Sequence, residues 1–155
     1  MGNAAIGAEA NVPNPALKAL DFLIGEWRTV GSHPALPGKA LSGKTSFSWH
    51  EGGAFLVMRT QVDEPQFPDG IAIIGSDDSA SRYSMIYFDQ RGISRIFDVT
   101  VGHHMVNWRR DDRDFAQSIT ITAGDGILVS KGRMSRSNGP WTDDLSQEFH
   151  REAAR

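Results

Sequence analysis

The spacing of apolar residues changes near residue 25, which divides the chain into a short helical segment and a long strand-rich segment. Asn14 is placed to cap a helix that Pro15 opens and Gly25 closes. The apolar side of this helix consists of Leu17, Leu20, Phe22 and Leu23. After Gly25 the spacing of apolar residues falls to two, which is typical of β-strands that have one buried face.

Glycine, proline and aspartate clusters divide the second segment into short runs with this alternation. The predicted strands span 25–33, 42–50, 54–62, 70–76, 82–89, 93–101, 104–110, 115–122, 127–135 and 143–151. Tight turns without crossover helices favour an all-β, antiparallel, up-and-down barrel of about ten strands, with the helix plugging one end. We expect a flexible arm at 1–14 and a single domain at 15–152. A barrel of this size has room for one small ligand.

The turn at Gln90-Arg91-Gly92 indicates how two central strands pair. If glycine takes the left-handed position of a three-residue turn, Tyr87 lies opposite Arg95 and Met85 lies opposite Phe97. A two-residue turn would mix apolar with charged positions on one face. The three-residue register is therefore preferred.

The next turn, read as Gly102-His103, pairs Val101 with His104 and Phe97 with Trp108. Both hairpins then place one mostly apolar face toward the lumen. The candidate ligand-binding residues on this face are Met85, Tyr87, Asp89, Arg95, Phe97, His104 and Trp108, and Arg59 is a further candidate anchor on an earlier strand. Two alternatives remain open: Arg95 forms an internal ion pair with Asp89, and Arg59 is a solvated strand end.

Composition excludes several classes of function. The net charge is −3 and basic residues are scattered, so no stripe suited to nucleic acid is present. The chain has no cysteine, no signal-like leader and no apolar run long enough to cross a bilayer. We expect a cytoplasmic protein without a nucleic-acid or membrane partner. No spacing typical of a metal site and no nucleophile elbow is present, so no metal and no cofactor are predicted.

Several blocks in order resemble the bacterial lipocalin-like proteins of the calycin group, near the nitrobindins and fatty-acid-binding proteins. The blocks are Phe22–Trp27, His33–Gly38, Trp49–Leu56, Phe67–Asp69, Tyr87–Gly92 and Trp141–Leu145. The resemblance implies the barrel but no activity. It also implies that Trp27 packs under Arg151 at the closed end of the barrel, where a cation–π stack would give the pairing a physical reason. In nitrobindins a histidine on the last strand holds haem; the matching segment 143–145 has none, which disfavours haem.

Two hypotheses of function follow. The preferred one is binding of a small apolar or amphipathic molecule in the lumen, with Arg95 or Arg59 pairing with an acidic group. The alternative is a cofactor-free lyase, isomerase or hydratase that uses Asp89, Tyr87 or His104 as acid or base. A homodimer is also predicted, because the outward face carries an apolar set. That set consists of Ile86, Phe88, Ile96 and Met105.

Overall fold

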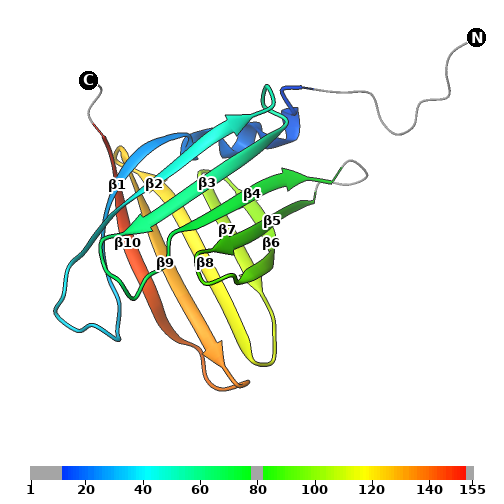
Figure 1. Ribbon diagram of the computed structural model, residues 1–155. Coiled ribbons are helices and arrows are strands. Elements are labelled where there is room, and N and C mark those ends of the chain that lie inside the picture. Colours follow the sequence, from blue (N-terminus) through cyan, green and yellow to red (C-terminus); the bar gives the residue numbers. More distant parts are fainter. Residues whose placement is uncertain (1–11, 78–81, 153–155) are drawn as a thin grey trace, which may run out of the picture.

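The chain forms one closed antiparallel β-barrel in a computed structural model (Figure 1). The structure describes residues 12–77 and 82–152, so most of the predicted N-terminal arm lies outside the described residues. Each strand pairs with its neighbours in sequence, and β1 pairs with β10 to close the ring. This strand order confirms the predicted up-and-down barrel. Short connections favour pairing between strands that follow each other in the sequence.

The observed elements match the predicted ranges closely. They are the helix η1 (Pro15–Leu23) and the strands β1 (Gly25–Ser32), β2 (Leu41–His50), β3 (Phe55–Val62), β4 (Gly70–Ser76), β5 (Tyr83–Asp89), β6 (Ser94–Gly102), β7 (Met105–Arg110), β8 (Phe115–Gly124), β9 (Ile127–Arg136) and β10 (Thr142–Arg151). Boundaries differ by one or two residues, which is ordinary for strand ends.

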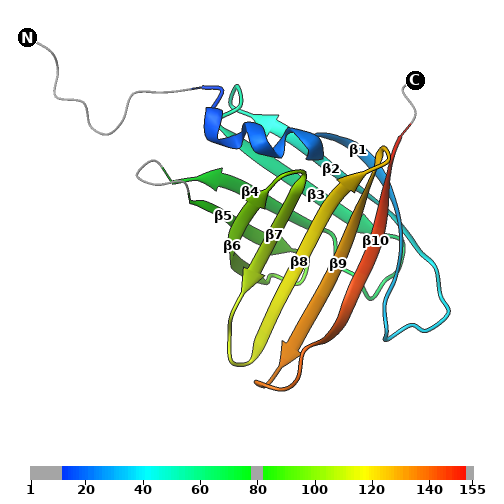
Figure 2. The same ribbon diagram turned by 180° about the vertical axis from the view of Figure 1, so that it is seen from behind.

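The helix η1 lies across one end of the barrel (Figure 2). It is a 3-10 helix, and its fully buried residues are Leu17, Leu20 and Leu23. Their spacing of three residues is the 3-10 repeat, so one apolar edge faces the barrel interior. The Asn14 side chain accepts a hydrogen bond from the Ala16 N–H at 3.0 Å, as a helix cap does. No helix in the described residues is long and apolar enough to cross a bilayer.

The closed end is held where the first strand meets the last. Trp27 is opposite Arg151 in the β1–β10 ladder, and the Arg151 Cζ lies 4.2 Å from the centroid of the Trp27 ring. The Trp27 indole N–H donates to the Leu23 carbonyl at 2.7 Å, and the Arg151 Nη1 donates to the Ile24 carbonyl at 3.0 Å. The expected cation–π stack is therefore present, and it also fastens the helix to the barrel.

Gly25 makes this approach possible. Its φ is +145°, and a Cβ at this position would lie 2.5 Å from the Arg151 Nη1. Any other residue would push the guanidinium away from the Trp27 ring. The Gly-x-Trp sequence is thus explained by the guanidinium that packs over it.

One predicted hairpin register is confirmed and the other is wrong. Tyr87 pairs with Arg95 and Met85 pairs with Phe97, as the three-residue turn requires. In the next hairpin Val101 pairs with Val106, not with His104, and Val99 rather than Phe97 pairs with Trp108. The turn is made by the two histidines at 103–104, with His104 at a φ of +50°, which shifts the ladder by two residues. An even shift leaves the paired strand residues on their predicted faces, but His104 is moved out of the strand and into the turn.

The outer surface of β5 and β6 carries the predicted apolar set. Ile96 is 70% exposed, Phe88 47% and Ile86 43%, whereas Met105 is half-buried. Ile86 and Ile96 are direct neighbours in the ladder, so the exposed surface is continuous. Contiguous exposed apolar surface is a common mark of subunit contacts, and the homodimer stays a prediction.

Trp27→Ala should lower the free energy of unfolding by about 3–5 kcal/mol, because it empties a large buried aromatic site and removes the stack. Chemical denaturation measures the loss. Trp141→Ala is the matched control, since Trp141 also stacks on an arginine, Arg109, but at the half-buried surface, and about 1 kcal/mol or less is expected. A loss under about 1 kcal/mol for Trp27→Ala would contradict the proposed role of the stack.

Sedimentation velocity at high micromolar concentration should show a dimer, and Ile96→Glu should shift it to the monomer, because a charge cannot be buried unpaired in an apolar contact. A wild-type protein that remains monomeric at that concentration would rule out association through this face.

Candidate functional site

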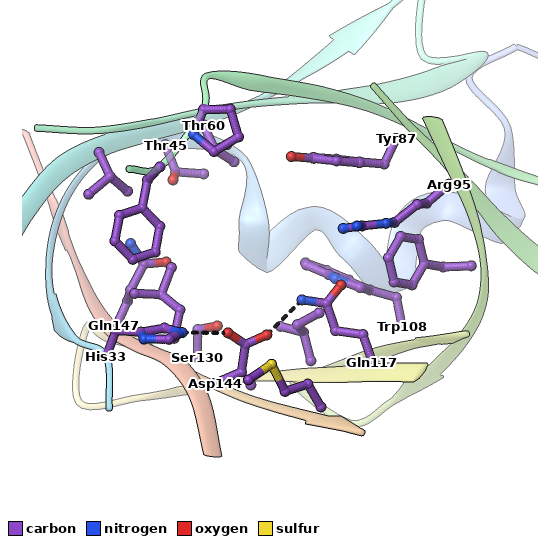
Figure 3. A pocket seen from close by; sticks show the side chains of 18 of the residues that line it. His33, Thr45, Thr60, Tyr87, Arg95, Trp108, Gln117, Ser130, Asp144 and Gln147 are labelled. Atoms are coloured by element: carbon purple, nitrogen blue, oxygen red, sulfur yellow. Dashed lines mark hydrogen bonds and ion pairs between the residues drawn. The ribbon is translucent and has the colours of Figure 1, made fainter. Parts of the chain in front are cut away.

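The barrel encloses a cavity of about 320 Å³ between the helix end and the opposite, open end (Figure 3). Inward residues of most strands line it. Its apolar wall includes Met58, Met85, Phe97, Trp108, Ile121 and Phe149. Its polar groups include His33, Thr45, Thr60, Tyr87, Arg91, Arg95, Gln117, Ser130, Arg136, Asp144 and Gln147. An apolar cavity with a limited set of polar groups is the usual form of a small-molecule site.

Arg95 points into the cavity from β6, next to Tyr87 (Figure 3). Its guanidinium lies over the face of Phe115, with 4.5 Å between Cζ and the ring centroid. Arg136 approaches the same ring at 5.0 Å. Among the described residues, neither arginine has a carboxylate within ion-pair distance. Burial, together with the nearby cations Arg91 and Arg110, lowers the pKa of Arg95.

Asp89, the alternative partner of Arg95, forms an ion pair with Arg91 instead. Asp89 accepts from the Arg91 Nη2 at 2.7 Å, from its Nε at 3.2 Å and from its backbone N–H at 2.9 Å. The alternative of an Arg95–Asp89 ion pair is therefore not what the structure shows. Arg91 is only two residues away in a tight turn, so this pairing is local and costs little chain entropy.

Tyr87 joins this pair through its hydroxyl, which donates to the Asp89 Oδ2 at 2.9 Å. Burial, and then the hydrogen bond to Asp89, raise the pKa of Tyr87 to about 12. The Arg91 side chain is the main reason that the pKa of Asp89 falls to about 2. At neutral pH one group holds its proton firmly and the other is firmly ionised, so neither is tuned for proton transfer.

A hydrogen-bond network of three side chains lies on the wall opposite Arg95. The His33 Nε2 lies 3.0 Å from the Asp144 Oδ1, and the Gln117 amide donates to the Asp144 Oδ2 at 2.8 Å. Because the His33 Nδ1 accepts from the Ala35 backbone N–H at 3.0 Å, the Nε2 of a neutral imidazole carries the proton and donates to Asp144. Figure 3 shows both contacts as dashed lines.

This hydrogen-bond network also shows whether the cavity has residues suited to hold haem or a metal ion. Asp144 belongs to segment 143–145, where the nitrobindin resemblance places the haem histidine, and it presents a carboxylate that two donors already engage. These residues do not fit a haem ligand. The described residues also contain no cluster of three or more histidine, aspartate or glutamate side chains suited to a metal ion.

The cavity is lined by five of the eight residues proposed as ligand contacts. These are Met85, Tyr87, Arg95, Phe97 and Trp108. Asp89 does not line it, because Tyr87 and Arg91 cover its carboxylate. Arg59 is exposed on the outer face of β3, since its neighbours Met58 and Thr60 face inward.

His104 is also away from the cavity. It is exposed in the β6–β7 turn, where its ring stacks on Phe22 of the helix with 6.2 Å between ring centroids. Of the three residues named for the enzyme hypothesis, Tyr87 and Asp89 are hydrogen-bonded to each other, whereas His104 lies apart from them.

Sequence reasoning missed several cavity residues. Phe115 and Gln117 share a face with the inward Ile119 and Ile121, so alternation along β8 could have identified them. Asp144 carried no such signal. The β9–β10 ladder changes register between 143 and 146, and this irregularity breaks the alternation.

Asp89→Asn should destabilise the fold by about 1–2 kcal/mol at pH 7, because it removes a charge whose folded-state pKa of about 2 lies below its ordinary value. This stability is present above pH 4 and is lost as the pH falls through 2, so wild type and variant should converge in acid. Denaturant titrations at several pH values measure this. Asp111→Asn, an exposed partner of Arg109, is the control and should change little. An equal deficit at pH 7 and pH 2 would contradict the assignment.

No protein-family model matches the sequence, and no curated protein matches it. Among solved structures, the chain is similar to the crystal structure of Rv2717c from M. tuberculosis, with a TM-score of 0.66 and 17% sequence identity. The match covers 92% of this chain and 100% of that chain. At this identity the likeness shows the fold, and it supports the ten-strand barrel independently of the sequence pattern.

Proposed function

We propose that this protein binds a small amphipathic acid in the barrel cavity, with the acidic group on Arg95 and the apolar body against the inner wall. The observation that carries the proposal is that Arg95 is half-buried, faces the cavity and has no carboxylate partner among the described residues. Placing a cation in a low-dielectric site is costly unless an anion accompanies it. A ligand carboxylate would supply that anion and gain charge-assisted hydrogen bonds.

The rest of the cavity supports the same class of ligand. Trp108, Phe97 and Met85 lie on neighbouring strands and offer an apolar surface beside the Arg95 side chain. Arg136 adds a second cation with no ion-pair partner in the described part of the chain, and the carboxylate of Asp144 is already hydrogen-bonded by two donors. The volume is at the low end of the range for small-molecule sites, which favours a compact ligand.

Anilinonaphthalene sulfonate and N-phenylnaphthylamine test the proposal, because they share an aromatic body and differ in the acidic group. Arg95→Leu should weaken binding of the sulfonate probe by about 10- to 150-fold, the equivalent of about 1.5–3 kcal/mol for a hydrogen bond to a charged group. Binding of the neutral probe should change less than about threefold. Fluorescence titration gives both constants, and decanoate should displace the sulfonate probe more readily than decanol does.

Arg59→Leu is the matched control, since Arg59 is an exposed arginine on the outside of the same barrel, and it should leave both affinities unchanged. Arg95→Leu should also leave the free energy of unfolding within about 1 kcal/mol, because Asp89 keeps its partner Arg91. Equal losses for the charged and neutral probes would contradict an acid-binding role. A failure of wild type to bind either probe would contradict the proposed function as a whole.

A further inference from the structure

A second hollow lies on the outside of the barrel, directly behind the cavity wall that Arg95 forms. This outer groove, of about 470 Å³, runs over β5, β6 and the end of β7. Its residues are Ile86, Phe88, Ser94, Arg95, Ile96, Asp98, Arg109, Arg110, Asp111 and Asp112. Arg95 also lines the inner cavity, and it is the residue that the two hollows share. The Arg95 side chain therefore lies between the two hollows.

The backbone ladder stops at the same place. Pairing between β6 and β7 begins at Gly102 with Met105 and ends at Asp98 with Arg109, so the residues 94–97 of β6 have no partner on β7. In contrast, the ladder between β8 and β9 runs without interruption from Phe115 to Gly124. β6 and β7 are adjacent in the wall (Figure 2). The barrel has a lateral gap between them that backbone hydrogen bonds do not close.

Side chains fill this gap. Phe115, at the start of β8, lies beneath the Arg95 guanidinium, and its carbonyl accepts from the Arg110 Nε at 3.1 Å. The contact between Arg95 and Phe115 is a stack on an aromatic face, which is weaker than a charge-assisted hydrogen bond to an acid. An acidic ligand can therefore draw Arg95 away from Phe115 with a net gain.

The open end of the barrel, by comparison, is tied by contacts between elements that are distant in sequence. His33 contacts Asp144 at 3.0 Å and packs edge-on against Phe67, with 5.6 Å between ring centroids. Lys39, in the loop after β1, forms an ion pair with Glu64, in the loop after β3. The helix η1 covers the other end. At the lateral gap, the contacts are instead the Arg95 stack on Phe115 and the Arg110 hydrogen bond to the Phe115 carbonyl.

We propose that ligands reach the cavity sideways through the gap between β6 and β7, and that Arg95 on Phe115 is the gate. Arg95 leaves the ring to bind the incoming acidic group and returns when the ligand leaves. In the monomer, in which the predicted dimer contact does not cover it, the exposed apolar side chain of Ile96 borders the outside of this route and receives the apolar body. This inference rests on the proposed function, because it describes the path of the same ligand.

The absence of cysteine makes a direct test possible, because two introduced cysteines are the only thiols. The side bridge uses Ile96→Cys with Asp111→Cys, both exposed and both on the outer groove, joined by a short bis-maleimide. The mouth bridge, the matched control, uses Lys39→Cys with Glu64→Cys, joined by the same reagent. Stopped-flow fluorescence of anilinonaphthalene sulfonate, the probe that carries an acidic group, gives the association and dissociation rates before and after bridging.

The side bridge should slow both rates at least tenfold relative to the same variant before bridging, with an unchanged amplitude at equilibrium. The mouth bridge should change them less than twofold. Two outcomes would overturn the lateral route. One is that the side bridge leaves both probe rates unchanged, and the other is that only the mouth bridge slows them tenfold. These outcomes leave the proposed function intact, since the probe still binds at equilibrium, whereas loss of binding by wild type overturns both.

Phe115→Leu gives a second measurement that needs no cross-link. Leucine fills the gap but offers Arg95 no aromatic face. Because the stack is present only in the free protein, the association rate of anilinonaphthalene sulfonate should rise at least threefold, whereas its dissociation rate should change less than twofold. Unchanged rates in this variant overturn the role of the stack as the gate.

Discussion

The pairing of β1 with β10 is the constraint on which the rest of the structure depends. A sheet of ten antiparallel strands encloses a cavity only if its first and last strands meet, and here they meet at Trp27 and Arg151. The same two side chains hold the C-terminal end of the helix through the carbonyls of Leu23 and Ile24. Closure of the ring and closure of one end are thus a single packing event, which Gly25 permits by leaving room for the guanidinium.

Inside the ring, the ion pair of Asp89 with Arg91 in the β5–β6 turn determines which contacts Arg95 makes. Asp89 forms its ion pair with Arg91 within this turn, and not with Arg95 on the next strand. Arg95 is left with an aromatic face instead of an anion. A half-buried cation of this kind stabilises the fold little, and it is the basis of the proposed preference of the cavity for acids.

The two ends and the side of the barrel differ in how they are held. Hydrophobic packing of Leu17, Leu20 and Leu23 covers one end, and hydrogen bonds to Asp144 span the wall near the other. Where β6 lacks a partner on β7, the barrier consists of side chains alone. Side chains exchange rotamers much faster than strands separate, so this region is suited to admitting a ligand without unfolding the ring.

The sequence by itself determined the strand order, the helix plug and the inward face of most strands, because each depends on neighbours within about a dozen residues. Even the β6–β7 register, wrong by two residues, kept Trp108 inside, since alternation is preserved by an even shift. Only the tertiary structure decided which charges meet. His33 and Asp144 are 111 residues apart, and the bulge in β10 that aims Asp144 inward leaves no periodic trace. Phe115 on β8 contacts Arg95 on β6 although β7 separates the two strands in the sheet, and no local pattern encodes such a contact.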